Sequence, residues 1–113
     1  MVVDDNVDAA EMLGVMLSEL GHNVTVAHDP LIAIARGDLK LFDAFILDIG
    51  LPNMDGHELA HRLRNQSREN SIFIAVTGYG QEDDRERTRA AGFRQHLVKP
   101  INMHELTKIL ADA

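Results

Sequence analysis

Short runs of apolar residues alternate with segments of helical periodicity along all 113 residues of the chain. This alternation is typical of βαβ units, in which helices cover both faces of a parallel sheet. A chain of this length is expected to form one domain, spanning 1–113. The pattern therefore predicts an α/β fold in which five strands and five helices follow one another.

Local signals set the expected bounds of these elements. A stripe of alanine and leucine at 3-4-3 spacing predicts a helix over 7–20 that Gly21 ends, and Gly92 ends a polar helix over 81–91. Asp29 is a predicted N-cap, with Pro30 opening a short helix that reaches about 37. The remaining helices are expected to start near 55 and 103. The strands are expected at 2–3, 23–27, 44–47, 72–76 and 93–98.

A doubly wound parallel sheet binds its ligands at the carboxyl ends of the strands, where the strand order reverses. The residues that directly follow the predicted strands are Asp4-Asp5, His28-Asp29, Asp48, Thr77-Gly78 and Lys99-Pro100. In the flavodoxin-like (βα)5 order, 2-1-3-4-5, the first and third strands are neighbours. Asp4, Asp5 and Asp48 are therefore expected to converge, with Thr77 and Lys99 approaching from the far side.

Three carboxylates at one place call for a cation, because two unit charges ~4 Å apart interact by about 4 kcal/mol at an effective dielectric of about 20. A set of oxygen ligands suits Mg²⁺. With the ion and Lys99 present, positive and negative charges balance, and the site can accept a phosphoryl group. Asp48 is the predicted nucleophile and would form an aspartyl phosphate. Thr77 can donate its hydroxyl to a phosphoryl oxygen, and Gly78 leaves room for the group.

Composition excludes several other classes. The formal net charge is −7 and the chain has three lysines, which argues against direct binding of nucleic acid. No stretch approaches the run of roughly 20 apolar residues that a membrane span needs. There is no cysteine and no signal-peptide pattern, so a cytoplasmic location is expected.

Four motifs carry a resemblance to a known family. VVDDN at 2–6, LDIGLPNMDG at 47–56, AVTGYG at 75–80 and LVKP at 97–100 resemble the receiver domain of two-component response regulators, in order and at the expected separations. DIGLPNMDG and GYGQEDDR are most similar to receivers attached to hybrid histidine kinases. The chain is therefore expected to be either a standalone regulator or a piece of a longer protein.

The resemblance implies a ligand set and a reaction. Asp48 would be phosphorylated by a phosphohistidine donor. Asp5 would ligate Mg²⁺ directly and Asp4 mainly through water, while Asp48 and the backbone carbonyl of Gly50 would complete the protein ligands. Mn²⁺ is the alternative ion. The domain would support its own phosphorylation and dephosphorylation without being an enzyme that acts on a separate substrate.

The resemblance also implies a switch. Lys99 would pair with the phosphoryl group, and its bond to Pro100 would be cis. In the family, the threonine moves inward on phosphorylation and an aromatic ring three residues before the lysine follows it. His96 stands at that place here, and we hypothesise that it acts as the rotating switch. A packed ring without a pH role is the alternative. The affected face, made by the fourth helix, fifth strand and fifth helix, would bind a downstream partner.

Further residues are expected beside the phosphoryl group. These neighbours are Ile49, Gly78 and Tyr79. These positions control how easily water reaches the phosphoryl group. Gly50 has no side chain to block the water and Tyr79 has a bulky one, so their effects on the lifetime of the phosphoryl group oppose each other. The donor, a histidine kinase or a histidine phosphotransfer domain, would dock near the first helix.

Other functions remain open at this point. A metal-dependent phosphatase or phosphotransferase could use the same aspartyl intermediate, but such enzymes commonly place a second Asp where this chain has Gly50. A nucleotide or flavin binder would need a Gly-rich loop after the first strand, and the loop here is acidic.

The segment HELAH at 57–61 fits the H-E-x-x-H pattern of a zinc hydrolase. In a helix that buries Leu59, Ala60 and Leu63, the two histidines should face solvent together with Arg64. The motif is therefore expected to be a coincidence.

Overall fold

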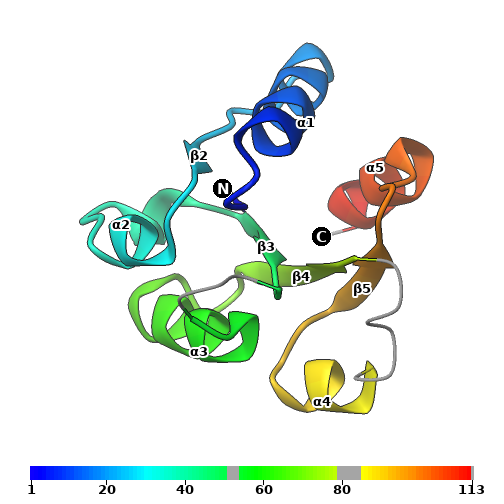
Figure 1. The fold of residues 1–113 in the computed structure, drawn as a ribbon. Helices are drawn as coiled ribbons and strands as arrows, with labels where there is room; N and C mark the ends of the chain where they lie inside the picture. Colours follow the sequence, from blue (N-terminus) through cyan, green and yellow to red (C-terminus); the bar gives the residue numbers. More distant parts are fainter. Residues whose placement is uncertain (51–53, 79–84, 113) are drawn as a thin grey trace.

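The computed structural model describes residues 1–50, 54–78 and 85–112. Within these ranges one parallel sheet has the strand order β2-β1-β3-β4-β5, as the sequence predicts. Figure 1 shows the strands running side by side through the centre of the domain. The strands are β1 (Val2–Val3), β2 (Val26–Ala27), β3 (Ala44–Asp48), β4 (Ile72–Thr77) and β5 (Gln95–Val98).

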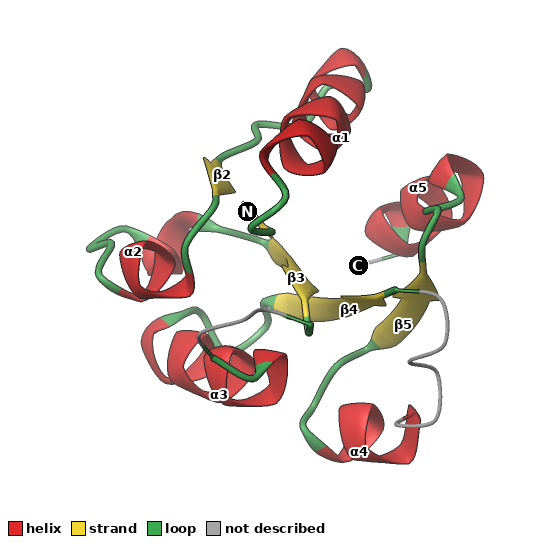
Figure 2. Ribbon diagram, in the orientation of Figure 1, coloured by secondary structure: helices red, strands yellow, loops and turns green. Residues whose placement is uncertain are grey.

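Helices cover both faces of this sheet. Helices α1 and α5 lie on one face, and α2, α3 and α4 lie on the other (Figures 1 and 2). None of the helices in the described ranges is both long and apolar enough to cross a bilayer. The helices are α1 (Val7–Glu19), α2 (Pro30–Ile34), α3 (Gly56–Gln66), α4 (Arg85–Ala90) and α5 (Met103–Ala111), with a short 3₁₀ helix at Leu39–Leu41.

The central strands are apolar on both faces because both faces are buried. In β4, Ile74 and Val76 belong to the cluster that α1 and α5 cover, while Phe73 and Ala75 belong to the cluster under α3. Phe73 also stacks on Phe45 of β3, with ring centroids 4.8 Å apart. Burial on both sides explains why these strands read as unbroken apolar runs rather than alternating ones.

The expected caps are present. Gly21 and Gly92 have φ values of 98° and 92°, and the side chain of Asp29 accepts a hydrogen bond from the Leu31 N–H, 2.8 Å away. Gly92 is required for a second reason, because a Cβ there would lie 2.3 Å from Nη1 of Arg64.

Several predicted elements have shorter bounds in the structure. The second strand covers Val26–Ala27 rather than 23–27, because its partner β1 has only two residues with which to pair. The second helix ends at Ile34 rather than near 37, and Arg36 beyond it pairs with Asp38 at 2.7 Å. The fifth strand starts at Gln95, since Phe93 turns into the core. The fourth helix ends at Ala90, and its predicted start at 81–84 lies outside the described residues.

The expectation that His57 faces solvent is wrong. Leu59, Ala60 and Leu63 are buried and His61 is exposed, as predicted, but the His57 side chain is only 12% exposed. Its Nδ1 lies 2.7 Å from Oδ1 of Asp55, and its ring meets Phe93 edge-on. Its Nε2 lies 3.4 Å from Oγ1 of the buried Thr88 in α4. His57 therefore joins α3 to α4.

Arg64 also turns toward α4 rather than toward solvent. Its guanidinium donates to the carbonyl oxygens of Ala91 and Gly92, at 2.6 and 3.0 Å, and lies 4.6 Å from the ring centroid of Phe73. The sequence of helix α4, RERTRA, is polar. Polar side chains of α3 therefore provide part of its attachment.

Replacing Arg64 with Met is expected to lower the free energy of unfolding by about 2–3 kcal/mol, because two charge-assisted hydrogen bonds and a cation–π contact are lost. Urea denaturation measures the change. The matched control is Arg62→Met on the same helix, where an exposed Arg62 lies 3.7 Å from Glu58. That variant should stay within about 0.5 kcal/mol of the wild type. Equal effects of the two variants would contradict the role given to Arg64.

Candidate functional site

Three carboxylates meet at the carboxyl edge of the sheet. Strands β1 and β3 pair with Val3 opposite Leu47, so the residues that follow, Asp4 and Asp48, come side by side. Asp4, Asp5 and Asp48 each offer an oxygen, and these oxygens all lie within 4.8 Å of one another. Among the described residues no other group of three or more acidic, histidine or cysteine side chains is arranged in this way. The donor set consists of oxygen atoms only, which fits Mg²⁺.

Backbone hydrogen bonds orient the two buried carboxylates. Asp4 is 7% exposed, and its Oδ1 accepts from the Asn6 N–H at 2.9 Å. Asn6 in turn caps α1 by accepting from the Ala9 N–H at 3.0 Å. Asp48 is 9% exposed, and its Oδ1 accepts from the Gly50 N–H at 2.9 Å. The start of α1 and the loop after β3 therefore set the directions of these side chains.

Lys99 brings a positive charge to the cluster. Its Nζ lies 3.1 Å from Oδ2 of Asp4 and 3.4 Å from Oδ2 of Asp48. Its backbone N–H donates to the Thr77 carbonyl at 2.8 Å, which ties the ends of β4 and β5 together. The Lys99–Pro100 bond is cis, as the resemblance implied.

One ammonium does not compensate three carboxylates. Burial raises the pKa of Asp48 above its ordinary value, and the nearby charge of Asp4 adds to this effect, although the Gly50 N–H and the Lys99 charge oppose it. The pKa of Lys99 is also raised. Its burial alone would lower that pKa, but the hydrogen bond to Asp4 and the charge of Asp48 outweigh the burial. The site thus favours an added cation.

Thr77 is fully buried and contacts the predicted switch residue. Its Oγ1 lies 2.8 Å from Nε2 of His96, which is half-buried on the neighbouring strand. His96 is in register with Ala75, so it lies on the same face of the sheet as Thr77. Gly78 follows Thr77 at the end of β4, and Tyr79 lies outside the described residues.

The loop after Asp48 is held by close packing. A Cβ added at Gly56 would lie 2.3 Å from the Cα of Ile49, so only glycine allows α3 to approach this loop so closely. The Ile49 N–H donates to the Val76 carbonyl at 3.0 Å. The glycine of the MDG turn therefore positions the backbone beside Asp48.

Sequence reasoning gave His28 no role, but it contacts the acidic loop. Its Nδ1 lies 3.3 Å from the backbone oxygen of Asp4, and its Nε2 lies 3.0 Å from Oε1 of Glu11 in α1. The available signal was its position directly after the second predicted strand.

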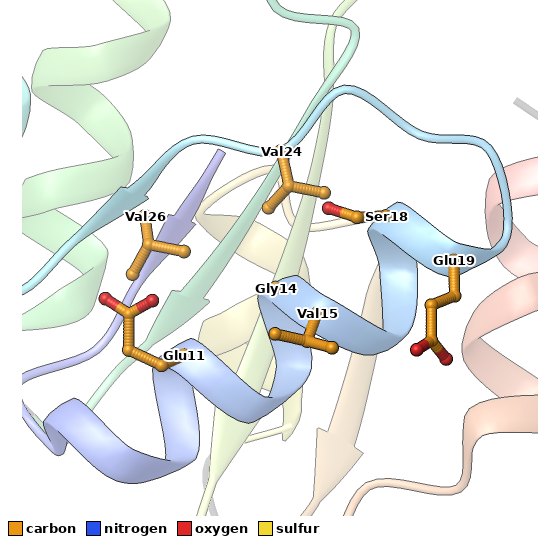
Figure 3. A pocket seen from close by; sticks show the side chains of 7 residues that line it. All are labelled: Glu11, Gly14, Val15, Ser18, Glu19, Val24 and Val26. Carbon is orange, nitrogen blue, oxygen red and sulfur yellow. The ribbon is translucent and has the colours of Figure 1, made fainter.

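A shallow groove of about 390 Å³ lies outside the acidic cluster, between α1 and the segment that leads into β2 (Figure 3). Gly14 allows these segments to approach, since a Cβ there would lie 2.9 Å from Cγ2 of Val26. Figure 3 shows Glu11 and Glu19 toward the two ends of the groove. The residues that line it are Glu11, Gly14, Val15, Ser18, Glu19, Val24 and Val26.

The family profile described as the response regulator receiver domain matches residues 1–111. The chain belongs to this family. As a receiver domain, it is a phosphoryl-accepting module of two-component signalling. The resemblance drawn from the four motifs is confirmed.

Relatives and solved structures agree with this assignment. The receiver domain is 34% identical to a 14.6 kDa protein of Leptolyngbya boryana, over 97% of this chain and 85% of that protein. It is 32% identical to the signal transduction histidine-protein kinase BarA of Escherichia coli, over 97% of this chain but only 12% of the kinase. A CheY-like receiver domain structure from Methanospirillum hungatei superposes with a TM-score of 0.86 at 26% identity, covering 98% of this chain and 88% of that one.

The match to part of BarA agrees with the predicted likeness to receivers attached to kinases.

The structure also bears on the zinc interpretation. In the HELAH segment, His57 contacts Asp55 and Thr88 while His61 is exposed, so the two histidines do not face one common site.

Replacing Asp48 with Asn is expected to raise the free energy of unfolding of the metal-free receiver domain near pH 7. Burial raises the pKa of Asp48 above its ordinary value of 3.8, so the folded state holds the Asp48 proton more tightly than the unfolded state does. Stability from this group is present below about pH 3.8 and is lost as the pH rises through the folded-state pKa. The advantage of the variant should therefore grow with pH over this range.

Urea denaturation in a chelating buffer, from about pH 4 to pH 7, measures this difference. Added Mg²⁺ should narrow it by stabilising the wild type. Glu69→Gln is the control, because it removes a carboxylate at an exposed position. A variant at Asp48 that is less stable than the wild type at pH 7 would contradict the electrostatic account.

Proposed function

We propose that Asp48 is the phosphoacceptor and that the phosphoryl group comes from a phosphohistidine donor. The observation that carries the proposal is the Asp48 carboxylate at the end of β3, with Asp4 and Asp5 beside it and the Lys99 ammonium 3.4 Å from Oδ2. A carboxylate oxygen attacks phosphorus as the phosphorus–nitrogen bond of the donor breaks. The imidazole leaves with the electron pair and takes a proton from solvent, and an aspartyl phosphate forms.

Mg²⁺, or Mn²⁺ as an alternative, would be held by Asp4, Asp5, Asp48 and the backbone carbonyl of Gly50. The carboxylate oxygens within 4.8 Å of one another support this assignment. When bound, such an ion offsets carboxylate charge and acts as a Lewis acid toward phosphoryl oxygens.

Two side chains of the receiver domain would contact the phosphoryl group. The Lys99 ammonium exchanges its carboxylate partners for a phosphoryl oxygen, and the Thr77 hydroxyl donates to another. Ile49, Gly78 and Tyr79 border the group and, with Gly50, set how easily water reaches it.

The output would be a change on the face formed by α4, β5 and α5. The Thr77–His96 contact supports this route, since it joins the buried end of β4 to a half-buried side chain of β5. A downstream partner would bind this face. We further propose that residues 1–113 form one receiver domain, that it does not turn over a separate substrate, and that it is of the kind attached to hybrid histidine kinases. A cytoplasmic location stays a prediction.

The donor would dock near α1. This helix exposes large apolar side chains, and it adjoins the acidic loop through the Asn6 cap. Apolar residues exposed on the surface of one helix favour contact with another helix. They are Val7, Met12, Val15, Met16 and Leu20.

Incubation with Mg²⁺ and acetyl phosphate should add one phosphoryl group to the wild type, detected as a mass increase. Asp48→Asn should show no increase, because the nucleophilic oxygen is lost. Asp43→Asn, at an exposed position, should be phosphorylated like the wild type. Chelation of the divalent ion should abolish the reaction in both proteins that retain Asp48. Phosphorylation of the Asn variant would reject the assignment.

Replacing the exposed Val15 with Asp should slow phosphoryl transfer from histidine phosphotransfer proteins at least tenfold, because a charge enters the apolar docking surface. The rate with acetyl phosphate should not change, since this small donor needs no docking. A panel of phosphorylated histidine phosphotransfer proteins supplies the donors. Ile32→Asp, at a similarly exposed position on α2, is the matched control. An equal slowing by both variants would place the docking surface elsewhere.

A further inference from the structure

The groove between α1 and β2 borders an open edge of the sheet, because β2 lies at one end of the strand order. The Thr25 carbonyl accepts from the Val2 N–H of β1 at 2.9 Å. The Ala27 carbonyl accepts from the Asp4 N–H at 3.1 Å. Backbone groups of successive strand residues point to opposite sides, so the N–H and carbonyl of Val26 point away from β1. This edge can therefore form hydrogen bonds with an added extended segment.

The groove has an apolar lining and a carboxylate toward each end. The apolar side chains are those of Val15, Val24 and Val26. Figure 3 shows Glu11 and Glu19 toward the two ends. Glu11 is 59% exposed and lies 3.0 Å from Nε2 of His28, and a contact so exposed to solvent contributes little to stability. Within the described ranges, Glu19 takes part in no ion pair. Both carboxylates can therefore accept a cation from a partner.

The spacing of the two glutamates matches an extended segment of five residues. Glu11 and Glu19 are eight residues apart on one helix, a rise of about 12 Å. Four steps along an extended chain span about 13 Å, and the first, third and fifth side chains lie on one face. A segment with basic residues at its ends and an apolar residue midway therefore places each cation near a glutamate and the apolar side chain on the valines.

A second copy of this chain does not supply such a segment. Wherever two basic residues of the chain stand four positions apart, the residue midway between them is Asp38, Gln66 or Arg87. None of these residues is apolar. The chain also has a net charge of −7, so two copies repel each other. The occupant is therefore a segment of a different polypeptide.

We propose that the β2 edge and the α1 groove form a docking site for an extended segment of another polypeptide with the pattern basic-x-apolar-x-basic. The segment adds a strand beside β2, its apolar side chain packs on the valines, and its two cations pair with Glu11 and Glu19. This site lies outside the acidic cluster, and the inference does not depend on phosphorylation. The exposed residues Met12, Met16 and Leu20 of α1 do not line the groove, so they remain accessible to a donor.

The test uses a fluorescein-labelled peptide, KTVTK, whose binding to the receiver domain in excess Mg²⁺ is followed by fluorescence anisotropy. Glu11→Gln and Glu19→Gln should each weaken binding about threefold, because each removes one exposed ion pair, and the double variant should weaken it about tenfold. Asp8→Asn is the matched control, because Asp8 is exposed on the same helix but does not line the groove. Val15 is left unchanged, since it belongs to both proposed docking surfaces.

The control should bind KTVTK like the wild type. An equal loss with Asp8→Asn would overturn the proposal, because the peptide would then respond to net charge alone. Absence of KTVTK binding to the wild type would also overturn it.

Two altered peptides test the pattern itself. ETVTE carries the opposite charge at both ends and should not bind. KTGTK lacks the apolar side chain and should bind at least about fivefold more weakly, because no apolar surface is buried against the valines. Equal binding of KTVTK and KTGTK would overturn the proposal, since the contact would then be electrostatic only.

Hydrogen exchange measured by NMR tests the added strand. The Val26 amide should exchange at least about tenfold more slowly with saturating KTVTK, because its N–H gains a partner. Peptide-induced shifts confined to the acidic cluster would overturn the proposal, because the peptide would then be only a counter-ion there. Shifts at Met12 and Met16 with unchanged exchange at Val26 would overturn it in favour of docking on the other flank of α1.

Discussion

The site depends on an incomplete balance of charge at one edge of the sheet. Asp4, Asp5 and Asp48 lie close together, and the Lys99 ammonium contacts two of them. Burial makes the ionised form of Asp48 costly, while the same carboxylates hold Lys99 protonated. Such an arrangement is stable enough to fold but favours one more cation, and with that cation it can hold an incoming anion. The parallel register of β1 and β3 creates this balance.

The charged edge is connected to its surroundings by directional contacts. Asp4 is joined to α1 through Asn6 and through the His28–Glu11 pair, and the loop after Asp48 packs on α3 at Gly56. These contacts link the buried carboxylates to the helix on which we expect a donor to dock. A shift of about 1 Å in a reacting group can lower a reaction rate by about a hundredfold. Rigid support of the carboxylates is therefore important for phosphoryl transfer.

Two kinds of contact attach the outer elements to the central strands. Helices α1, α3 and α5 bury apolar stripes against the central strands, which gives a large and non-directional stabilisation. Polar contacts from His57 and Arg64 join α4 to α3, and β5 carries the Thr77–His96 bond. An individual hydrogen bond can exchange its partner at little net cost in free energy, whereas rearranging a close-packed core is costly. A face that we propose to change with phosphorylation is better built from exchangeable hydrogen bonds.

The sequence by itself determined the strand order, the alternation of elements and the glycine caps. It also determined that the carboxylates meet Lys99. Periodicity and capping signals are local, and residues that follow parallel strands meet at one edge of the sheet whatever the details of packing. It could not determine that β2 has only two residues, since strand length depends on the partner that pairs with it. It misplaced His57 and Arg64 because an apolar stripe defines the buried face of α3 but not which polar neighbour covers its flank. The His96–Thr77 bond and the role of His28 were likewise decided by tertiary structure, because each joins side chains from different strands or helices at distances that no sequence spacing encodes.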